Sequence, residues 1–185
     1  MKSLPHQTSL FSFETTLSKA GLSHDHTVAD FGSGKSMNFL YALRSALGKK
    51  GHIFAIDILP EVIEHIEREI KHHDIEGLTL LQANIEAKNG VPLSEAALDR
   101  IFIINTLHQI SDTIALFNEA KRLLKETGQI IVVDWALTPS PLGPNSSRRL
   151  SAKSVIETAL FGGLTLKAQF LPGPYHYGLV FSKNS

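Results

Sequence analysis

Apolar runs alternate with amphipathic stretches along most of the 185 residues of this chain. The short apolar runs predict buried strands, which we place at residues 28–31, 52–57, 78–83, 99–105 and 129–135. The amphipathic stretches between them predict helices at residues 37–47, 60–73 and 111–128. Strands and helices that alternate in this way are typical of a mostly parallel sheet with helices on both faces.

The ends of the predicted helices carry local signals. Pro60 stands in the first turn of the helix at residues 60–73, where the missing backbone N–H removes no hydrogen bond. Ser111 or Asp112 is expected to cap the start of the next helix, and Gly128 to end it.

The last part of the chain predicts a change of strand direction. Residues 138–149, rich in proline and serine, lead to a helix near residues 151–161. Two strands follow at residues 164–171 and 176–182, and the short connection PGPY between them predicts an antiparallel hairpin. We therefore expect residues 1–185 to form a single α/β domain with a Rossmann-like, doubly wound sheet.

The composition excludes several classes of protein. Lysine plus arginine and aspartate plus glutamate both number 18, so the net charge gives no reason to expect a nucleic acid or an anionic membrane as partner. The chain has no cysteine, which excludes disulfides, thiolate nucleophiles and cysteine-ligated zinc. No stretch approaches the roughly 18 apolar residues of a membrane span, and the start lacks the apolar core of a signal peptide. A cytoplasmic location is the expectation.

The stretch VADFGSGKS at residues 28–36 predicts a ligand loop after the first strand. A phosphate-binding loop would require glycine where Ala29 stands, and the strand would have to end before that position. A dinucleotide loop would require a third glycine where Met37 stands, and a bulky side chain there opposes close packing of helix on strand. Asp30 would repel a phosphate in either case, whereas it would attract the ammonium of a methionine. Its alternative role is to hydrogen-bond the loop.

This stretch resembles the first motif of the class I S-adenosylmethionine-dependent methyltransferases, which has an acidic residue two positions before a G-x-G-x-G loop. Asp30, Gly32 and Gly34 match the motif, and Ser36 replaces the last glycine. NTLHQI at residues 105–110 and the segment at residues 121–134 also look like stretches of this family. The resemblance covers most of the chain and implies a seven-stranded sheet whose last strand is antiparallel.

The resemblance implies S-adenosyl-L-methionine as the cofactor. Asp57, at the end of the second strand, would accept hydrogen bonds from the ribose hydroxyls, although a carboxylate there serves NAD equally well and could instead cap the next helix. Asn84 takes the place of an aspartate that contacts the adenine amino group in the family, and its alternative role is that of a turn residue. The expected cofactor-binding residues are Asp30, Gly32, Ser33, Gly34, Asp57, Ile58, Asn84, Ile85 and Asn105.

No catalytic residue is assigned, because a methyl group on a sulfonium is already activated and the protein chiefly positions the acceptor. His108, Asp134 and His176 are the candidates for a general base. Arg148 and Arg149 are interpreted as a solvated basic pair rather than an anion site, and no metal is expected.

The expected function is methyl transfer to a small molecule by in-line displacement. The segment at residues 3–20 and the connection at residues 138–149 are the parts available to shape a pocket, which a second subunit of a homo-oligomer could complete. Two alternatives stay open: a nucleotide-dependent oxidoreductase, and a non-catalytic module that binds the cofactor.

Overall fold

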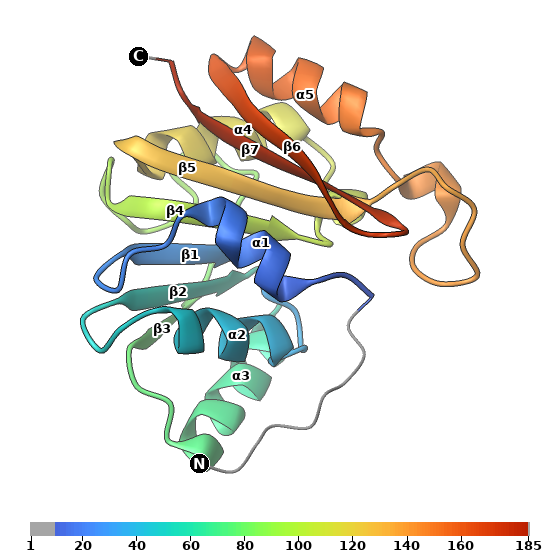
Figure 1. Ribbon diagram of the computed structural model, residues 1–185. Coiled ribbons are helices and arrows are strands. Elements are labelled where there is room, and N and C mark those ends of the chain that lie inside the picture. The colour runs from blue at the N-terminus through green and yellow to red at the C-terminus, as the bar shows by residue number, and fades with distance from the viewer. Residues whose placement is uncertain (1–9, 185) are drawn as a thin grey trace.

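The structure, a computed structural model, describes residues 10–184 and has a seven-stranded sheet at its centre (Figure 1). The strands are β1 (Thr27–Phe31), β2 (His52–Asp57), β3 (Leu78–Gln82), β4 (Leu98–Ile104), β5 (Leu124–Trp135), β6 (Leu164–Gly173) and β7 (His176–Lys183). Their order across the sheet is β3-β2-β1-β4-β5-β7-β6. The first five strands are parallel, and β7 runs antiparallel to both β5 and β6, so the expected sheet and the terminal hairpin are confirmed.

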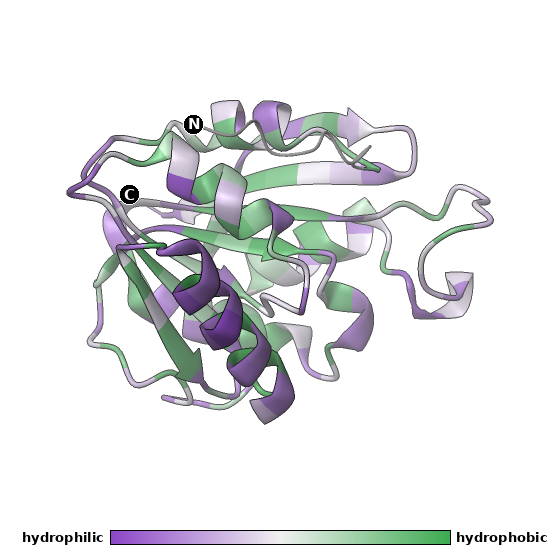
Figure 2. Ribbon diagram, turned by 90° about the horizontal axis from the view of Figure 1, so that it is seen from below, coloured by the Kyte–Doolittle hydropathy of each residue, from purple (hydrophilic) through white to green (hydrophobic). Residues whose placement is uncertain are grey.

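Helices cover both faces of this sheet (Figure 1). One face carries α1 (Phe13–Ala20), α2 (Asn38–Ala46) and α3 (Pro60–His73), and the other carries α4 (Thr113–Leu123) and α5 (Ala152–Phe161). Two apolar clusters fill the layers, and Figure 2 shows the strands largely green beneath helices whose outer sides are purple. This arrangement buries the near-continuous apolar strands on both sides, as their sequences require.

Several helix boundaries follow the local signals in the sequence. The helix with Pro60 in its first turn spans Pro60–His73, as expected. Of the two candidates for the cap of α4, Asp112 is the cap, because its side chain accepts a hydrogen bond from the backbone N–H of Ala115 at 2.9 Å. Ser12 and Ser151 cap α1 and α5 in the same way.

The boundary between α4 and β5 differs from the expectation. The helix expected at residues 111–128 ends at Leu123, and β5 begins at Leu124 rather than at residue 129. Leu124 pairs with Leu98 of β4, the register shifts, and regular pairing resumes at Gln129. Gly128 therefore does not end the helix. A Cβ at this position would lie 2.6 Å from Cδ1 of Leu124, so the glycine lets the irregular strand pass close to that side chain.

A buried ion pair fastens the connection between β3 and β4 to α4. Glu119 is 2% exposed and accepts hydrogen bonds from the backbone N–H groups of Asn89 and Val91 at 3.1 and 3.0 Å. Arg122 binds the same carboxylate and donates to the carbonyl oxygens of Val91 and Leu93. The pair thus supplies hydrogen bonds to a segment that has no helix or strand of its own between residues 83 and 97.

The sheet order also determines where a ligand can bind. β1 is paired with β2 on one side and β4 on the other, so the chain changes direction across the sheet at β1. In open α/β sheets the connections diverge at this point and leave a crevice at the carboxyl ends of the strands. The glycine loop follows β1 at this end of the sheet.

We predict that Arg122→Ala lowers the free energy of unfolding by about 3 kcal/mol, because it leaves the Glu119 carboxylate buried without its cation. Urea denaturation of the variant measures this change. The matched control is Lys71→Ala on α3, which breaks a pair whose side chains are 72% and 54% exposed and should cost less than about 0.5 kcal/mol. Equal losses for the two variants would contradict the assignment.

Candidate functional site

The loop after β1 is built on two glycines with different roles. Gly32 and Gly34 both have a positive φ, of 75° and 61°. A Cβ on Gly32 would lie 2.5 Å from Cγ2 of Thr106, whereas a Cβ on Gly34 would have no atom within 4 Å. Gly32 is therefore required for packing inside the protein. Gly34 presents bare backbone to open space, which is the arrangement that allows a ligand to approach closely.

The loop is fastened to the end of β2. The backbone N–H groups of Gly32 and Ser33 both donate to the carbonyl oxygen of Ile56, at 2.8 and 3.0 Å. The N–H of Gly34 donates to Oδ2 of Asp57 at 3.0 Å, and Oδ1 of the same carboxylate accepts from the N–H of Leu59 at 3.0 Å. Asp57 thus caps the entry to α3 and also orients the glycine loop. Each carboxylate oxygen retains a second lone pair for a hydroxyl donor.

Asp30 is a buried carboxylate directly below this loop. It is 3% exposed, and burial raises the pKa of its carboxyl to about 7, against a smaller lowering by a hydrogen bond from Ser33. The neighbouring charge of Asp57 raises the pKa further. Two carboxylates that share one loop create a negative potential, which suits a cationic group of a ligand and opposes a phosphate.

The residues expected near an adenine ring lie at the ends of β2 and β3. Ile58 follows Asp57 and is 54% exposed. Asn84 follows β3, and its Oδ1 accepts a hydrogen bond from the N–H of Glu86 at 2.9 Å, so it is a turn residue whose side-chain N–H₂ is not used in that bond. Ile85 is 8% exposed and packs in one of the apolar clusters. The structure therefore leaves Ile58 and Asn84 exposed after the ends of β2 and β3 and places Ile85 mostly in the core.

The loop after β4 joins the glycine loop to the terminal hairpin. Thr106 donates its hydroxyl to the carbonyl oxygen of Phe31 at 3.1 Å, which fixes it against Gly32. Asn105 has a φ of 53°, a conformation that asparagine tolerates better than most residues, and its Oδ1 lies 3.0 Å from Nε2 of His176. Sequence reasoning missed Thr106, because its contact with Gly32 becomes visible only when β1 and β4 are placed side by side.

Of the three candidates for a general base, Asp134 already accepts hydrogen bonds from the backbone. It is 1% exposed, and its oxygens accept hydrogen bonds from the N–H groups of Leu107 and Trp135 at 2.8 and 2.7 Å. Burial raises the pKa of this carboxyl to about 6. Its observed role is to hold the short 3₁₀ helix Leu107–Gln109. His108 in that helix and His176 at the start of β7 each have a buried Nδ1 without a hydrogen-bond partner in the described residues.

The interpretation of Arg148 and Arg149 as a solvated pair is wrong for Arg149. Arg149 is 7% exposed and donates to the carbonyl oxygens of four residues of its own connection, Ala136, Thr138, Leu142 and Pro144. Its guanidinium also lies 5.2 Å from the ring centre of Trp135. Arg149 therefore stabilises the connection after β5, which projects beyond the hairpin in Figure 1. Arg148 remains exposed, as expected.

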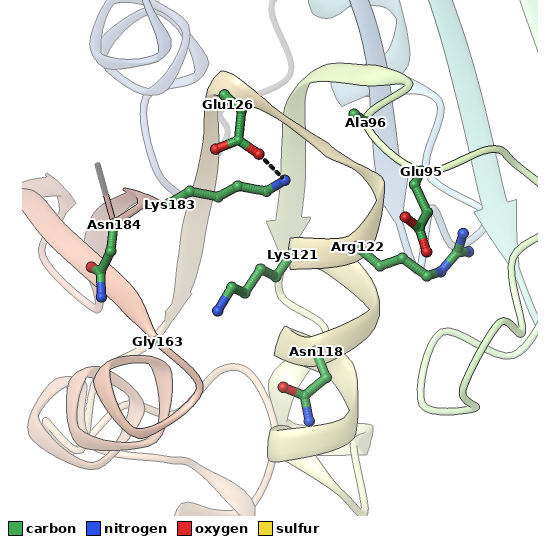
Figure 3. A pocket seen from close by; sticks show the side chains of 9 residues that line it. All are labelled: Glu95, Ala96, Asn118, Lys121, Arg122, Glu126, Gly163, Lys183 and Asn184. Carbon is green, nitrogen blue, oxygen red and sulfur yellow. Dashed lines mark hydrogen bonds and ion pairs between the residues drawn. The ribbon is translucent and has the colours of Figure 1, made fainter.

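A cavity at the opposite end of the strands does not belong to this site. It has a volume of about 570 Å³ and lies between α4, the start of β5 and the end of β7 (Figure 3). Its lysines are already engaged, because Lys121 donates to the carbonyl oxygen of Gly162 at 3.0 Å and Lys183 lies 2.8 Å from Oε1 of Glu126. This cavity opens at the amino ends of the parallel strands, away from the glycine loop.

Residues 10–184 contain no group of three His, Asp or Glu side chains that could hold a metal ion. None of the helices described here is both long enough and apolar enough to cross a membrane.

Comparison with solved structures places the fold among the methyltransferases. An S-adenosylmethionine-dependent methyltransferase from Aquifex aeolicus is 25% identical, with a TM-score of 0.85 over 93% of this chain and 89% of that chain. A TehB-like methyltransferase from Corynebacterium glutamicum is 17% identical, with a TM-score of 0.71 over 94% and 88% of the two chains. The [4+2]-cyclase SpnF is 13% identical, with a TM-score of 0.77 over 92% and 80%.

Comparison of sequences gives the family. A search of curated proteins finds no match. The family model described as "Methyltransferase domain" matches residues 22–168, which include every strand from β1 to β5 and the loops at their carboxyl ends. The chain therefore belongs to the methyltransferase domain family, with the α/β fold of the class I S-adenosylmethionine-dependent methyltransferases.

Proposed function

We propose that this protein transfers the methyl group of S-adenosyl-L-methionine to a small-molecule acceptor by in-line displacement. The observation that carries the proposal is the loop after β1, where the open backbone of Gly34 lies beside Asp57 and above the buried Asp30. This combination suits a ligand that has both ribose hydroxyls and an ammonium group. Family membership and the structural likeness to a protein described as S-adenosylmethionine-dependent support the same cofactor.

Different residues after β1, β2, β3 and β4 would contact different parts of the cofactor. Asp57 would accept hydrogen bonds from the ribose hydroxyls, and Ile58 and Asn84 would lie against the adenine, with Ile85 behind them. Gly32, Ser33 and Gly34 would follow the ligand with their backbone, while Asp30 would balance the charge of the methionine ammonium and Asn105 would border the site from β4. When bound, the cofactor supplies a methyl group activated by its sulfonium, so the protein's contribution is to orient the acceptor and exclude water.

Asp30 and Met37 argue against the oxidoreductase alternative. A pyrophosphate at this loop would meet the Asp30 carboxylate instead of the bare helix amino end that favours an anion. Met37 is 7% exposed and packs in the core at the start of α2, where a dinucleotide loop requires a glycine for close helix–strand contact.

A thermal-shift comparison of S-adenosylmethionine, S-adenosylhomocysteine, NAD and ATP tests the proposal. A ligand at 100 times its dissociation constant stabilises the protein by about 2.7 kcal/mol. We expect stabilisation by the first two compounds only. Stabilisation by NAD alone would favour the oxidoreductase, and binding of the cofactor without methyl transfer to any acceptor would favour the non-catalytic module.

We predict that Asp57→Ala weakens binding of S-adenosylhomocysteine by about 10- to 100-fold, which corresponds to the roughly 1.5–3 kcal/mol of hydrogen bonds to a charged group. The free energy of unfolding should also fall by about 1 kcal/mol, since the cap at Leu59 is lost. Calorimetric titration and urea denaturation separate the two effects. Asp57→Asn is the control, because it keeps an oxygen for the cap but not the charge. Unchanged affinity in Asp57→Ala would remove Asp57 from the site.

We predict opposite results for the two glycines of the loop. Gly34→Val should abolish binding of S-adenosylhomocysteine, because its side chain would enter open space that the ligand requires, and its positive φ should cost about 1–3 kcal/mol of stability without a steric clash. Gly32→Ala should lower the melting temperature even without ligand, because its Cβ would collide with Thr106. Native affinity in the folded Gly34→Val protein would show that the ligand binds elsewhere.

We predict that affinity for S-adenosylhomocysteine rises about five- to tenfold between pH 6 and pH 7.5. Asp30 has a pKa of about 7 in the free protein, so below that pH it must lose a proton before it can pair with an ammonium group. The same raised pKa means that the folded state binds more protons than the unfolded state, so this group lowers the stability of the free protein as pH rises toward 7. Calorimetry at several pH values tests the prediction, and Asp30→Asn should remove the pH dependence.

A further inference from the structure

The side chain of Asn105, directly after β4, is held by His176 at the start of β7. Oδ1 of Asn105 lies 3.0 Å from Nε2 of His176, which is 1% exposed. The imidazole packs against Trp135 and Phe11, at 4.3 and 4.9 Å between ring centres, so it has little freedom to turn. A residue of the terminal hairpin therefore sets the orientation of an amide group two strands away.

The buried Nδ1 of His176 indicates which ring nitrogen carries the hydrogen. Nδ1 has no hydrogen-bond partner within residues 10–184. A buried N–H without an acceptor is rarer than an acceptor without a donor, so the hydrogen belongs on Nε2. Burial, and then the charge of Arg149, lower the pKa of the imidazole to about 4, so the ring carries one hydrogen near pH 7. Nε2 thus donates, and the atom of Asn105 that accepts is its amide oxygen.

The amide nitrogen of Asn105 is consequently left for another partner. Because the oxygen is bound toward β7, the N–H₂ group on the other side of the amide carbon points away from that strand. The N–H₂ has no hydrogen-bond partner in the part of the chain that the structure describes, and it is not among the buried atoms that lack one, so a ligand can reach it. The φ of 53° at Asn105 is of the kind that gathers at binding sites.

The other donors around the glycine loop are already used by the fold. The backbone N–H groups of Gly32, Ser33 and Gly34 all donate to oxygens at the end of β2. The hydroxyls of Ser33 and Thr106 donate to carbonyl oxygens at the end of β1. The N–H₂ of Asn105, which directly precedes Thr106, therefore differs from these donors in being unused.

An amino-acid group bound at this loop needs partners for two opposite charges. The buried Asp30 suits its ammonium, but a carboxylate would be repelled by Asp30 and Asp57 and requires a donor. β2, which ends in Asp57, and β4, which precedes Asn105, lie on opposite sides of β1. Asn105 thus places an uncharged donor on the side of the loop that is away from Asp57.

We propose that the N–H₂ of Asn105 binds the carboxylate of the cofactor's methionine group, and that His176 is the positioning residue that holds the amide in this orientation. This inference rests on the proposed function and specifies how the same site recognises its ligand. His176 lies outside the matched residues 22–168, so the family model does not supply this contact.

The test compares S-adenosylhomocysteine with its decarboxylated analogue, which keeps the ammonium and lacks the carboxylate. Asn105→Asp retains an oxygen for Nε2 of His176 and tolerates a positive φ, but it replaces the N–H₂ by a negative oxygen. Calorimetry should show S-adenosylhomocysteine bound about 10- to 100-fold more weakly, as expected for a lost hydrogen bond to a charged group. The analogue should bind at least as tightly as to the native protein. Equal weakening of both compounds would overturn the proposal.

Lys35→Ala is the matched control, because Lys35 is an exposed cation directly after the glycine loop. It should change the affinity for either compound by less than about twofold, since an exposed charge is screened. A loss restricted to S-adenosylhomocysteine in Lys35→Ala, with none in Asn105→Asp, would assign the carboxylate to Lys35 and overturn the proposal.

Two variants test the positioning role of His176. His176→Leu should weaken binding of S-adenosylhomocysteine by about three- to tenfold and leave binding of the analogue unchanged. His176→Gln, whose amide N–H₂ can donate to Asn105, should restore most of the lost affinity. A general loss of packing would instead affect both compounds, and that result would reject the role of His176.

The ¹⁵N spectrum of the native protein gives a readout that does not depend on the folding of any variant. His176 should have a protonated Nε2 and an unprotonated Nδ1. The opposite tautomer would turn the amide oxygen of Asn105 toward the ligand and overturn the proposal. Failure of the native protein to bind S-adenosylhomocysteine would reject the proposed function itself, whereas binding that Asn105→Asp leaves unchanged would reject only this inference.

Discussion

The close packing of Gly32 against Thr106 is the contact on which the crevice depends. Any side chain on Gly32 would overlap Thr106, so the loop after β1 can cross the end of β4 only as bare backbone. Three further features accompany that contact. The hydroxyl of Thr106 donates to the carbonyl oxygen of Phe31 at the end of β1, and the N–H groups of Gly32 and Ser33 donate to the carbonyl oxygen of Ile56. Gly34 faces open space. The chain thus uses one glycine to hold the loop and a second to leave it accessible.

The buried carboxylates show how the same chemical group serves different purposes in one fold. Glu119 has a cation and two backbone donors, which offset the cost of burying its charge. Asp134 has backbone donors only and holds the turn after β4. Asp30 has a neighbouring carboxylate and a raised pKa, which makes it costly to ionise. A group that destabilises the free protein but can be neutralised by a ligand cation is expected at a binding site rather than in a core.

Much of the sheet could be predicted from the sequence because it depends on local patterns. The bounds of α3 and β2 match the apolar periodicity and the position of Pro60, and the crevice follows from the order of parallel strands. The end of α4 could not be predicted, because pairing of Leu124 with Leu98 overrides the continued helical pattern up to Gly128. The same holds for the candidate site. Asp30, Gly34 and Asp57 could be predicted, because they lie at or just after the ends of strands that the apolar pattern reveals. Arg149 was misjudged because its four carbonyl partners exist only after the connection has folded back.

The cluster of Phe11, Trp135 and His176 depends on contacts between distant segments, so local patterns in the sequence do not reveal it. Phe11, Trp135 and His176 come from three separate segments and meet only in the folded molecule. The proposed cofactor-binding residues lie mainly after β1 and β2, which the family model includes, whereas Phe11 and His176 lie outside the matched residues 22–168. Related folds can carry different activities, as the name of the [4+2]-cyclase SpnF indicates for that protein. Residues that distinguish this chain from its relatives are therefore expected outside the matched segment, where Phe11 and His176 lie, although Trp135 lies inside it.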